Sequence, residues 1–141
     1  MAAFWLRRRF QHLAGYWGMV KRDDEGLGRL LDALKSLHLS DHTILIYTCD
    51  HGCHFKTRND EYKRSPHESS IRVPTVLRAH AFERGLRIDA LVSLIDLPPT
   101  LLDAAGIEVP LWMQGHSIMP LVRGSNVDWP DDVFARQPRR S

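Results

Sequence analysis

A short apolar segment that ends abruptly in polar residues is the feature that most restricts how this sequence can fold. Residues 43–48, Thr-Ile-Leu-Ile-Tyr-Thr, are β-branched, aromatic and apolar without alternation, and Cys-Asp-His-Gly follows at 49–52. Such a strand is typical of a parallel sheet that is covered on both faces. The segment therefore predicts an α/β fold. Ligand sites in such folds lie beyond the carboxyl ends of the strands, where Asp50 and His51 stand.

The flanking segments fit the same fold class. Residues 17–39 predict a helix, because apolar side chains recur at helical spacing along one face. These side chains are Val20, Leu27, Leu30, Leu31, Leu34 and Leu37. Residues 53–70 have no period and predict a long loop, which is uncommon in a compact domain unless it is functional. Residues 71–77 predict a second strand, and Pro74 restricts that strand to an edge or a bulge.

A second helix is predicted at residues 97–105. Asp96 can cap its N-terminus, Pro98 and Pro99 suit its first turn, and Gly106 can end it. The chain after residue 110 is loop-like.

Composition narrows the class of protein. The chain has 141 residues, 43% hydrophobic and 26% charged, which is typical of one globular domain. Its formal charge of +2 depends on arginines near the two ends, so nucleic-acid binding is not predicted. No stretch approaches the roughly 20 apolar residues of a membrane-spanning helix. The start shows no secretory signal peptide, and the compartment stays unknown.

Three interpretations compete for residues 49–54, Cys-Asp-His-Gly-Cys-His. A zinc or haem site is disfavoured, because Cys49 and Cys53 are separated by three residues instead of two. The second interpretation is a strand that simply ends in polar residues. The third is a hard-cation site, in which Asp50 and His51 would supply two ligands. Because Ca²⁺ takes about six or more ligands, the others would come from outside this segment.

Several motifs in order resemble the sulfatase family. The family pattern is a strand ending in Asp-(Asn or His)-Gly, a loop with a lysine, Glu-x-x-x-Arg-x-Pro, Asp-x-x-Pro-Thr-Leu-Leu, and Gln-Gly-x-Ser before Pro-Leu. Here these motifs fall at residues 50–52, 53–67, 68–74, 96–102 and 114–121. The resemblance covers residues 16–134. It implies an alkaline-phosphatase-like α/β fold, with a mostly parallel sheet flanked by helices, that is partial and truncated at both ends.

The resemblance also implies roles for individual residues. Asp50 and His51 correspond to the family's second pair of calcium ligands, for Ca²⁺ or another divalent cation. Lys63 corresponds to the lysine that contacts the sulfate ester. Lys63 lies five residues before Glu68, as in the family, and this spacing favours it over Lys56. A fixed ammonium and a divalent cation would both stabilise the negative charge that develops as a sulfate ester is cleaved.

Other polar residues receive weaker predictions. His54 is a candidate catalytic residue that could donate a proton or contact the sulfate. His67 stands where family members often carry an aromatic residue, so it is not assigned a role. Arg72 is expected to brace its strand or to pair with Glu68, and Asp96 is expected to be a helix cap.

The family's nucleophile is missing from this sequence. Formylglycine is made from a Cys or Ser within a Cys/Ser-x-Pro-x-Arg segment, and the 141 residues contain no such segment. The family's first pair of calcium ligands, two adjacent aspartates that end a strand, is also missing. Asp23 and Asp24 do not replace that pair, since they lie within a predicted helix. The chain alone is therefore expected to be inactive.

These observations predict three parts. Residues 16–134 would be the C-terminal portion of a sulfatase catalytic domain, between atypical basic tails at 1–15 and 135–141. A frame change or a wrong gene boundary would produce such tails. The expected partners are a sulfate-ester small molecule or sulfated carbohydrate and the missing N-terminal half of the domain. Two alternatives stay open: a fragment of a related phosphodiesterase or phosphonate hydrolase, and a non-catalytic binding remnant.

Overall fold

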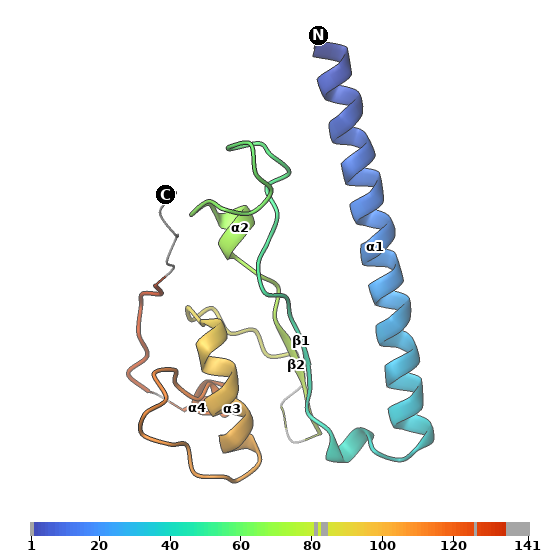
Figure 1. Ribbon diagram of the computed structural model, residues 1–141. Coiled ribbons are helices and arrows are strands. Elements are labelled where there is room, and N and C mark those ends of the chain that lie inside the picture. The colour runs from blue at the N-terminus through green and yellow to red at the C-terminus, as the bar shows by residue number, and fades with distance from the viewer. Residues whose placement is uncertain (1, 81, 83–84, 126, 135–141) are drawn as a thin grey trace. The chain divides into compact units, whose positions relative to one another are not determined.

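The computed structural model describes residues 2–80, 82, 85–125 and 127–134, which form two compact units (Figure 1). The first unit extends through His80, and the second comprises the described residues from 82 onward. The predicted tail at 135–141 lies outside the described residues.

A long helix, α1 (Ala2–Ser36), opens the first unit. The sequence correctly predicted a helix here but placed its start at residue 17, because apolar periodicity begins there. Residues 2–15, which were predicted to be a tail, are helical, and their content of Ala, Leu, Arg and Gln favours this state. The Asp23-Asp24 pair lies inside α1, as predicted.

The end of α1 is a Schellman motif. The backbone N–H of His38 donates to the Lys35 carbonyl (3.1 Å), and that of Leu39 donates to the Leu34 carbonyl (2.9 Å). His38 has a φ of +56°, in the left-handed region that usually belongs to glycine. Because the backbone reverses here, the helix stops at Ser36 and does not reach residue 39.

A long-looped hairpin follows α1 and a short 3₁₀ turn, η1 (Ser40–His42). Strands β1 (Leu45–Tyr47) and β2 (Val76–Arg78) pair antiparallel, with Ile46 opposite Leu77. The expectation of a parallel sheet buried on both faces is wrong for this pair. The connection between the strands folds back, so the two strands run antiparallel. Tyr47, the last residue of β1, is 39% exposed, so this strand is not buried on both faces.

The predicted strand at residues 71–77 begins later than expected. Residues Glu68–Ile71 form one helical turn, α2, in which the His67 carbonyl accepts the N–H groups of Ser70 and Ile71. Pro74 has no N–H to contribute to a ladder and stands before β2. The strand is therefore limited to the three residues of β2.

The second unit is built around α3 (Leu97–Ala104), which continues directly from a 3₁₀ turn, η2 (Leu94–Asp96). The predicted helix is confirmed, with two prolines in its first turn. Its end is also a Schellman motif, with Gly106 at a φ of +71°. A short helix, α4 (Met119–Val122), packs against α3.

The apolar core is small. Among the described residues, the buried hydrophobic side chains are Ile118 and Met119, both in the second unit, while Trp112 is 78% exposed. Buried polar residues, including Thr100 and Asp96, contribute to the interior alongside them. Hydrogen bonds to these buried polar groups therefore fix much of the local geometry.

Candidate functional site

The loop between β1 and β2 carries the predicted site residues, and its two legs are held together. Beyond the strands, the hydroxyls of Thr48 and Thr75 lie 3.0 Å apart. The backbone N–H of Gly52 then donates to the Ser70 carbonyl (2.8 Å). A Cβ on residue 52 would overlap the Ser69 carbonyl oxygen, so the close approach of the two legs requires glycine. This explains the glycine of the Asp-His-Gly motif physically.

Three predicted site residues come together at this loop: Asp50, His51 and Lys63. The Nε2 atom of His51 lies 2.6 Å from Lys63 Nζ and 3.4 Å from Asp50 Oδ2. The side chains of Asp50 and His51 are 84% and 39% exposed. We call this group the Asp50–His51–Lys63 cluster. Because its polar atoms face solvent, a ligand can reach them.

The hydrogen bonds of His51 define its tautomer. Its Nδ1 lies 2.8 Å from the carbonyl oxygen of Gly52, and a carbonyl can only accept, so Nδ1 carries the proton. The Lys63 ammonium can only donate, so Nε2 presents its lone pair. A neutral imidazole is also the form that binds a metal ion, and a cation at Nε2 would take the place of the Lys63 ammonium there.

The donor set fits part of a divalent-cation site. One carboxylate and one imidazole nitrogen are the ligands available, whereas Ca²⁺ takes about six or more. Within the described ranges, no group of three or more His, Cys, Asp or Glu side chains could hold a metal ion. Asp50 and His51 therefore fit two positions of a larger coordination shell, not a complete site.

His54 is separated from the cluster by burial. Its side chain is 2% exposed, and neither ring nitrogen has a hydrogen-bond partner among the residues that the structure describes. Its backbone N–H donates to the Tyr62 carbonyl (2.8 Å), and its carbonyl accepts the Thr57 N–H (2.9 Å). The ring offers no surface to a substrate in this arrangement, so a catalytic role for His54 stays a prediction.

The turn after His54 has a strained backbone and contains Lys56, the alternative candidate for the lysine that contacts the sulfate. Phe55 and Lys56 both have positive φ, +51° and +57°, as in a type I′ turn, where asparagine and glycine are usual. The Lys56 ammonium lies 5.1 Å from the centroid of the Tyr62 ring. Lys56 therefore makes a cation–π contact, whereas Lys63 is the lysine that contacts His51.

The remaining loop residues behave as structural groups. Arg72 pairs with Glu68 at 3.4 Å, as predicted, and both side chains are largely exposed. His67 precedes α2 as its N-cap residue without a capping hydrogen bond from its side chain.

Asp96 ties the second unit together and does more than cap a helix. Its Oδ2 accepts the Ser93 N–H (2.7 Å), and its Oδ1 accepts the N–H of His116, twenty residues later (2.8 Å). The prediction placed the cap on the following helix, but the side chain makes no capping bond to α3 and instead caps η2. The carboxylate points back toward Ser93 because Asp96 is itself the last residue of that turn.

Two neighbouring residues extend this junction. The backbone N–H of Ile118 donates to the buried Thr100 hydroxyl (3.0 Å). At Gly115, a Cβ would overlap the Ile95 carbonyl oxygen. The Asp-x-x-Pro-Thr and Gln-Gly-x-Ser motifs are therefore two sides of one structural junction.

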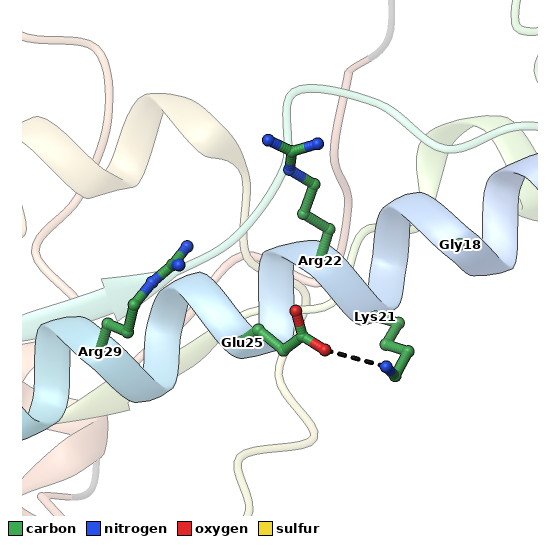
Figure 2. A pocket seen from close by; sticks show the side chains of 5 residues that line it. All are labelled: Gly18, Lys21, Arg22, Glu25 and Arg29. Atoms are coloured by element: carbon green, nitrogen blue, oxygen red, sulfur yellow. Dashed lines mark ion pairs between the residues drawn. The ribbon is translucent and has the colours of Figure 1, made fainter.

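A shallow hollow of about 330 Å³ lies along α1, away from the residues of the cluster. Its lining residues are Gly18, Lys21, Arg22, Glu25 and Arg29. Figure 2 shows Arg22 and Arg29 pointing to one side of the helix, and a dashed line marks the ion pair of Lys21 with Glu25 (2.9 Å). Exposed pairs of this kind contribute little stability, and the hollow contains none of the predicted site residues.

Sequence patterns did not single out Ser65 and Ser70, which the structure buries at 9% and 3% exposure. Their hydroxyl oxygens lie 3.0 Å apart inside the loop that carries the cluster. The two serines lie in a polar, aperiodic segment, so no sequence signal could distinguish them from solvated loop residues.

None of the helices in the described ranges combines the length and the apolar character that crossing a membrane requires.

The comparisons with known proteins agree with the motifs. The profile of the sulfatase family matches residues 4–107. Arylsulfatase K of Rattus norvegicus is 40% identical over 121 residues, which cover 86% of this chain and 21% of the relative. The chain therefore belongs to the sulfatase family, whose activity is the hydrolysis of sulfuric esters. It spans about a fifth of the length of the curated relatives it matches.

Solved structures place the fold in the same group. A phosphonate monoester hydrolase from Silicibacter pomeroyi matches with a TM-score of 0.70 and 29% identity, over 76% of this chain and 21% of that one. A protein solved with its substrate D-glucosamine-2-N,6-O-disulfate matches with a TM-score of 0.61 and 33% identity, over 76% of this chain and 22% of that one. The chain is thus an α/β portion of the alkaline-phosphatase-like fold.

Proposed function

We propose that this chain supplies one part of the active site of a sulfuric ester hydrolase. Asp50 and His51 would be two ligands of a divalent cation, and Lys63 would contact the anionic oxygens of the ester. The observation that carries the proposal is the contact between Lys63 Nζ and His51 Nε2, since it joins residues twelve positions apart in the loop.

The chemistry of sulfate-ester cleavage suits this group of side chains. Negative charge builds on the sulfuryl oxygens and on the leaving oxygen, and a fixed ammonium lowers its energy. A bound divalent cation would add Lewis-acid stabilisation of the same charge. Asp50 and His51 would hold that cation, and the Gly52 carbonyl would keep the proton of His51 on Nδ1. The cation would displace the Lys63 ammonium from His51 Nε2 and leave it to contact the ester.

The chain alone is proposed to be inactive. Its 141 residues contain no Cys/Ser-x-Pro-x-Arg segment, from which formylglycine arises. We expect no release of sulfate from an aryl sulfate by the purified chain above the rate in buffer. Turnover that disappears in a Lys63→Ala variant would contradict this expectation.

We propose a sulfated carbohydrate as the substrate class. The matched structure that contains D-glucosamine-2-N,6-O-disulfate supports this choice, because that ligand is described as the protein's own substrate. A small aryl sulfate would serve as a general probe of the same chemistry.

Phosphonate hydrolysis is the alternative activity, and the matched phosphonate monoester hydrolase supports it as the activity of a related protein. A cation and an ammonium would stabilise a phosphonate ester in the same way. The curated relatives named arylsulfatase K, at up to 40% identity, make sulfate the preferred anion. Competition between inorganic sulfate and methylphosphonate for the Lys63 signal in NMR would rank the two anions.

Calorimetry tests the proposed cation ligands. Ca²⁺ would be titrated into the wild-type chain, the Asp50→Asn variant and an Asp60→Asn control, which changes an exposed aspartate in the same loop. We expect the heat of binding to be lost in Asp50→Asn and kept in Asp60→Asn. Equal binding by all three chains would refute the assignment of Asp50. Binding of Ca²⁺ and a sulfated sugar by the purified chain would favour a retained function, whereas aggregation of the chain would favour a fragment with no role of its own.

A further inference from the structure

A buried pair of serine hydroxyls sits in an otherwise solvated loop. Ser65 and Ser70 are 9% and 3% exposed, and their Oγ atoms lie 3.0 Å apart. Their neighbours Arg64, Pro66 and Ser69 are exposed. Burying two hydroxyls is favourable only if they are hydrogen-bonded, so this contact defines how the loop closes.

The serine pair closes a ring of contacts that begins and ends at Lys63. The N–H of Ser65 donates to the Lys63 carbonyl (2.9 Å), and the hydroxyl pair joins Ser65 to Ser70. The Ser70 carbonyl accepts the Gly52 N–H (2.8 Å), and the Gly52 carbonyl accepts Nδ1–H of His51 (2.8 Å). Finally, Lys63 Nζ donates to His51 Nε2 (2.6 Å).

We infer that Ser65 and Ser70 are positioning residues that hold Lys63 beside His51, in the contact that the metal-free chain shows. This inference rests on the proposed function, because it assigns Lys63 and His51 to the site. The hydroxyl pair links the Lys63 segment to Ser70, whose carbonyl accepts the Gly52 N–H of the other leg. Without it, the Lys63 segment keeps the backbone bond between His54 and Tyr62 but loses its link to Ser70, and a lysine side chain has several flexible bonds over which to lose the contact.

The location of the pair separates positioning from general support of the fold. The β1–β2 ladder and α1 do not include either serine. The Thr48–Thr75 contact also ties the legs together beyond the strands. Removing one hydroxyl is therefore expected to loosen the position of Lys63 while the hairpin persists.

The test compares Ser65→Ala and Ser70→Ala with Ser69→Ala, which removes an exposed hydroxyl one residue away. The readout is the NMR signal of His51 Nε2 at fixed pH. We expect this signal to move toward that of an imidazole nitrogen without a donor in Ser65→Ala and Ser70→Ala, and to stay unchanged in Ser69→Ala. The double variant should resemble either single variant, because one substitution already breaks the pair. Ser65→Thr retains the hydroxyl and should retain the signal.

Inorganic sulfate, followed at Lys63 Nζ, separates this inference from the proposed function. We expect the apparent Kd for sulfate to rise roughly fivefold in Ser65→Ala, as the loss of one net hydrogen bond implies. An unchanged His51 signal and unchanged Kd in Ser65→Ala, with sulfate still bound at Lys63, would overturn the positioning role alone. If sulfate shifts no signal of Lys63 or His51 even in the wild-type chain, the proposed function fails instead. If Ser65→Ala loses the β1–β2 amide signals while Ser65→Thr keeps them, the hydroxyls are structural and the inference is wrong.

Discussion

Asp50 and Asp96 each follow an apolar segment, yet the two regions around them are built in opposite ways. Asp96 is 6% exposed, and both of its carboxylate oxygens accept backbone N–H groups. The side chain of Asp50 is 84% exposed, and its contact among the described residues is with His51, itself a candidate ligand.

The difference shows how a carboxylate that stabilises the fold can be distinguished from one that is available to bind a ligand. Asp96 has its hydrogen-bonding capacity filled by the protein, so little is left for a ligand. Asp50 keeps its lone pairs toward solvent beside an imidazole nitrogen and an ammonium. A family motif can thus mark either a structural junction or a ligand site, and the contacts of its side chains distinguish the two.

The largest effect is expected from Asp96→Ala. We expect it to lower the free energy of unfolding of the second unit by about 3 kcal/mol, since two hydrogen bonds to a charged group are lost. Hydrogen exchange at the His116 amide would measure the change. Asp50→Ala, the matched substitution, should change stability by less than about 0.5 kcal/mol. Similar losses of stability in Asp96→Ala and Asp50→Ala would contradict the distinction between the two carboxylates.

Glycine substitutions should give the next largest effects. Gly52→Ala and Gly115→Ala each place a methyl group against a backbone carbonyl, and we expect each to cost about 2 kcal/mol of stability. Only Gly52→Ala should also shift the imidazole signals of His51. Gly28→Ala is the control, because a Cβ there meets nothing within 4 Å, and it should stabilise α1 by up to about 1 kcal/mol. Denaturant unfolding and NMR would show whether both regions respond as described.

The smallest effect concerns the strained turn beside the cluster. Lys56→Gly removes a left-handed lysine, which should contribute about 1 kcal/mol of stability, against about 0.5 kcal/mol for the lost contact with Tyr62. We therefore expect a small net gain in thermal stability with the His51 signal unchanged. Lys56→Ala loses the contact and keeps the strain, so it should be less stable than wild type. A loss of stability in Lys56→Gly would contradict the turn geometry.

Local signals in the sequence predicted the parts of the fold that local chemistry determines. The helix at α3 was predicted because its prolines and Gly106 act within one turn of each end. The choice of Lys63 over Lys56 as the sulfate contact stays a prediction, and Lys63 is the lysine that contacts His51. The pairing of Arg72 with Glu68 was likewise predictable, because the two residues are four positions apart in the sequence.

Long-range contacts account for what the sequence did not predict. The antiparallel direction of β1 and β2 depends on how residues 48–75 fold back, which no short period encodes. The bond from His116 to Asp96 spans twenty residues and uses a backbone donor, so no side-chain pattern indicates it. The burial of Ser65 and Ser70 is a property of the closed loop and not of either residue type.

One NMR titration with Ca²⁺ tests the central claim on both regions at once. We expect the signals of Asp50 and His51 to shift as Ca²⁺ is added, with Lys63 responding because it contacts His51. The signals of Asp96 and His116 should stay in place, since that carboxylate is already satisfied by backbone donors. Shifts at Asp96 with none at Asp50 and His51 would contradict the account.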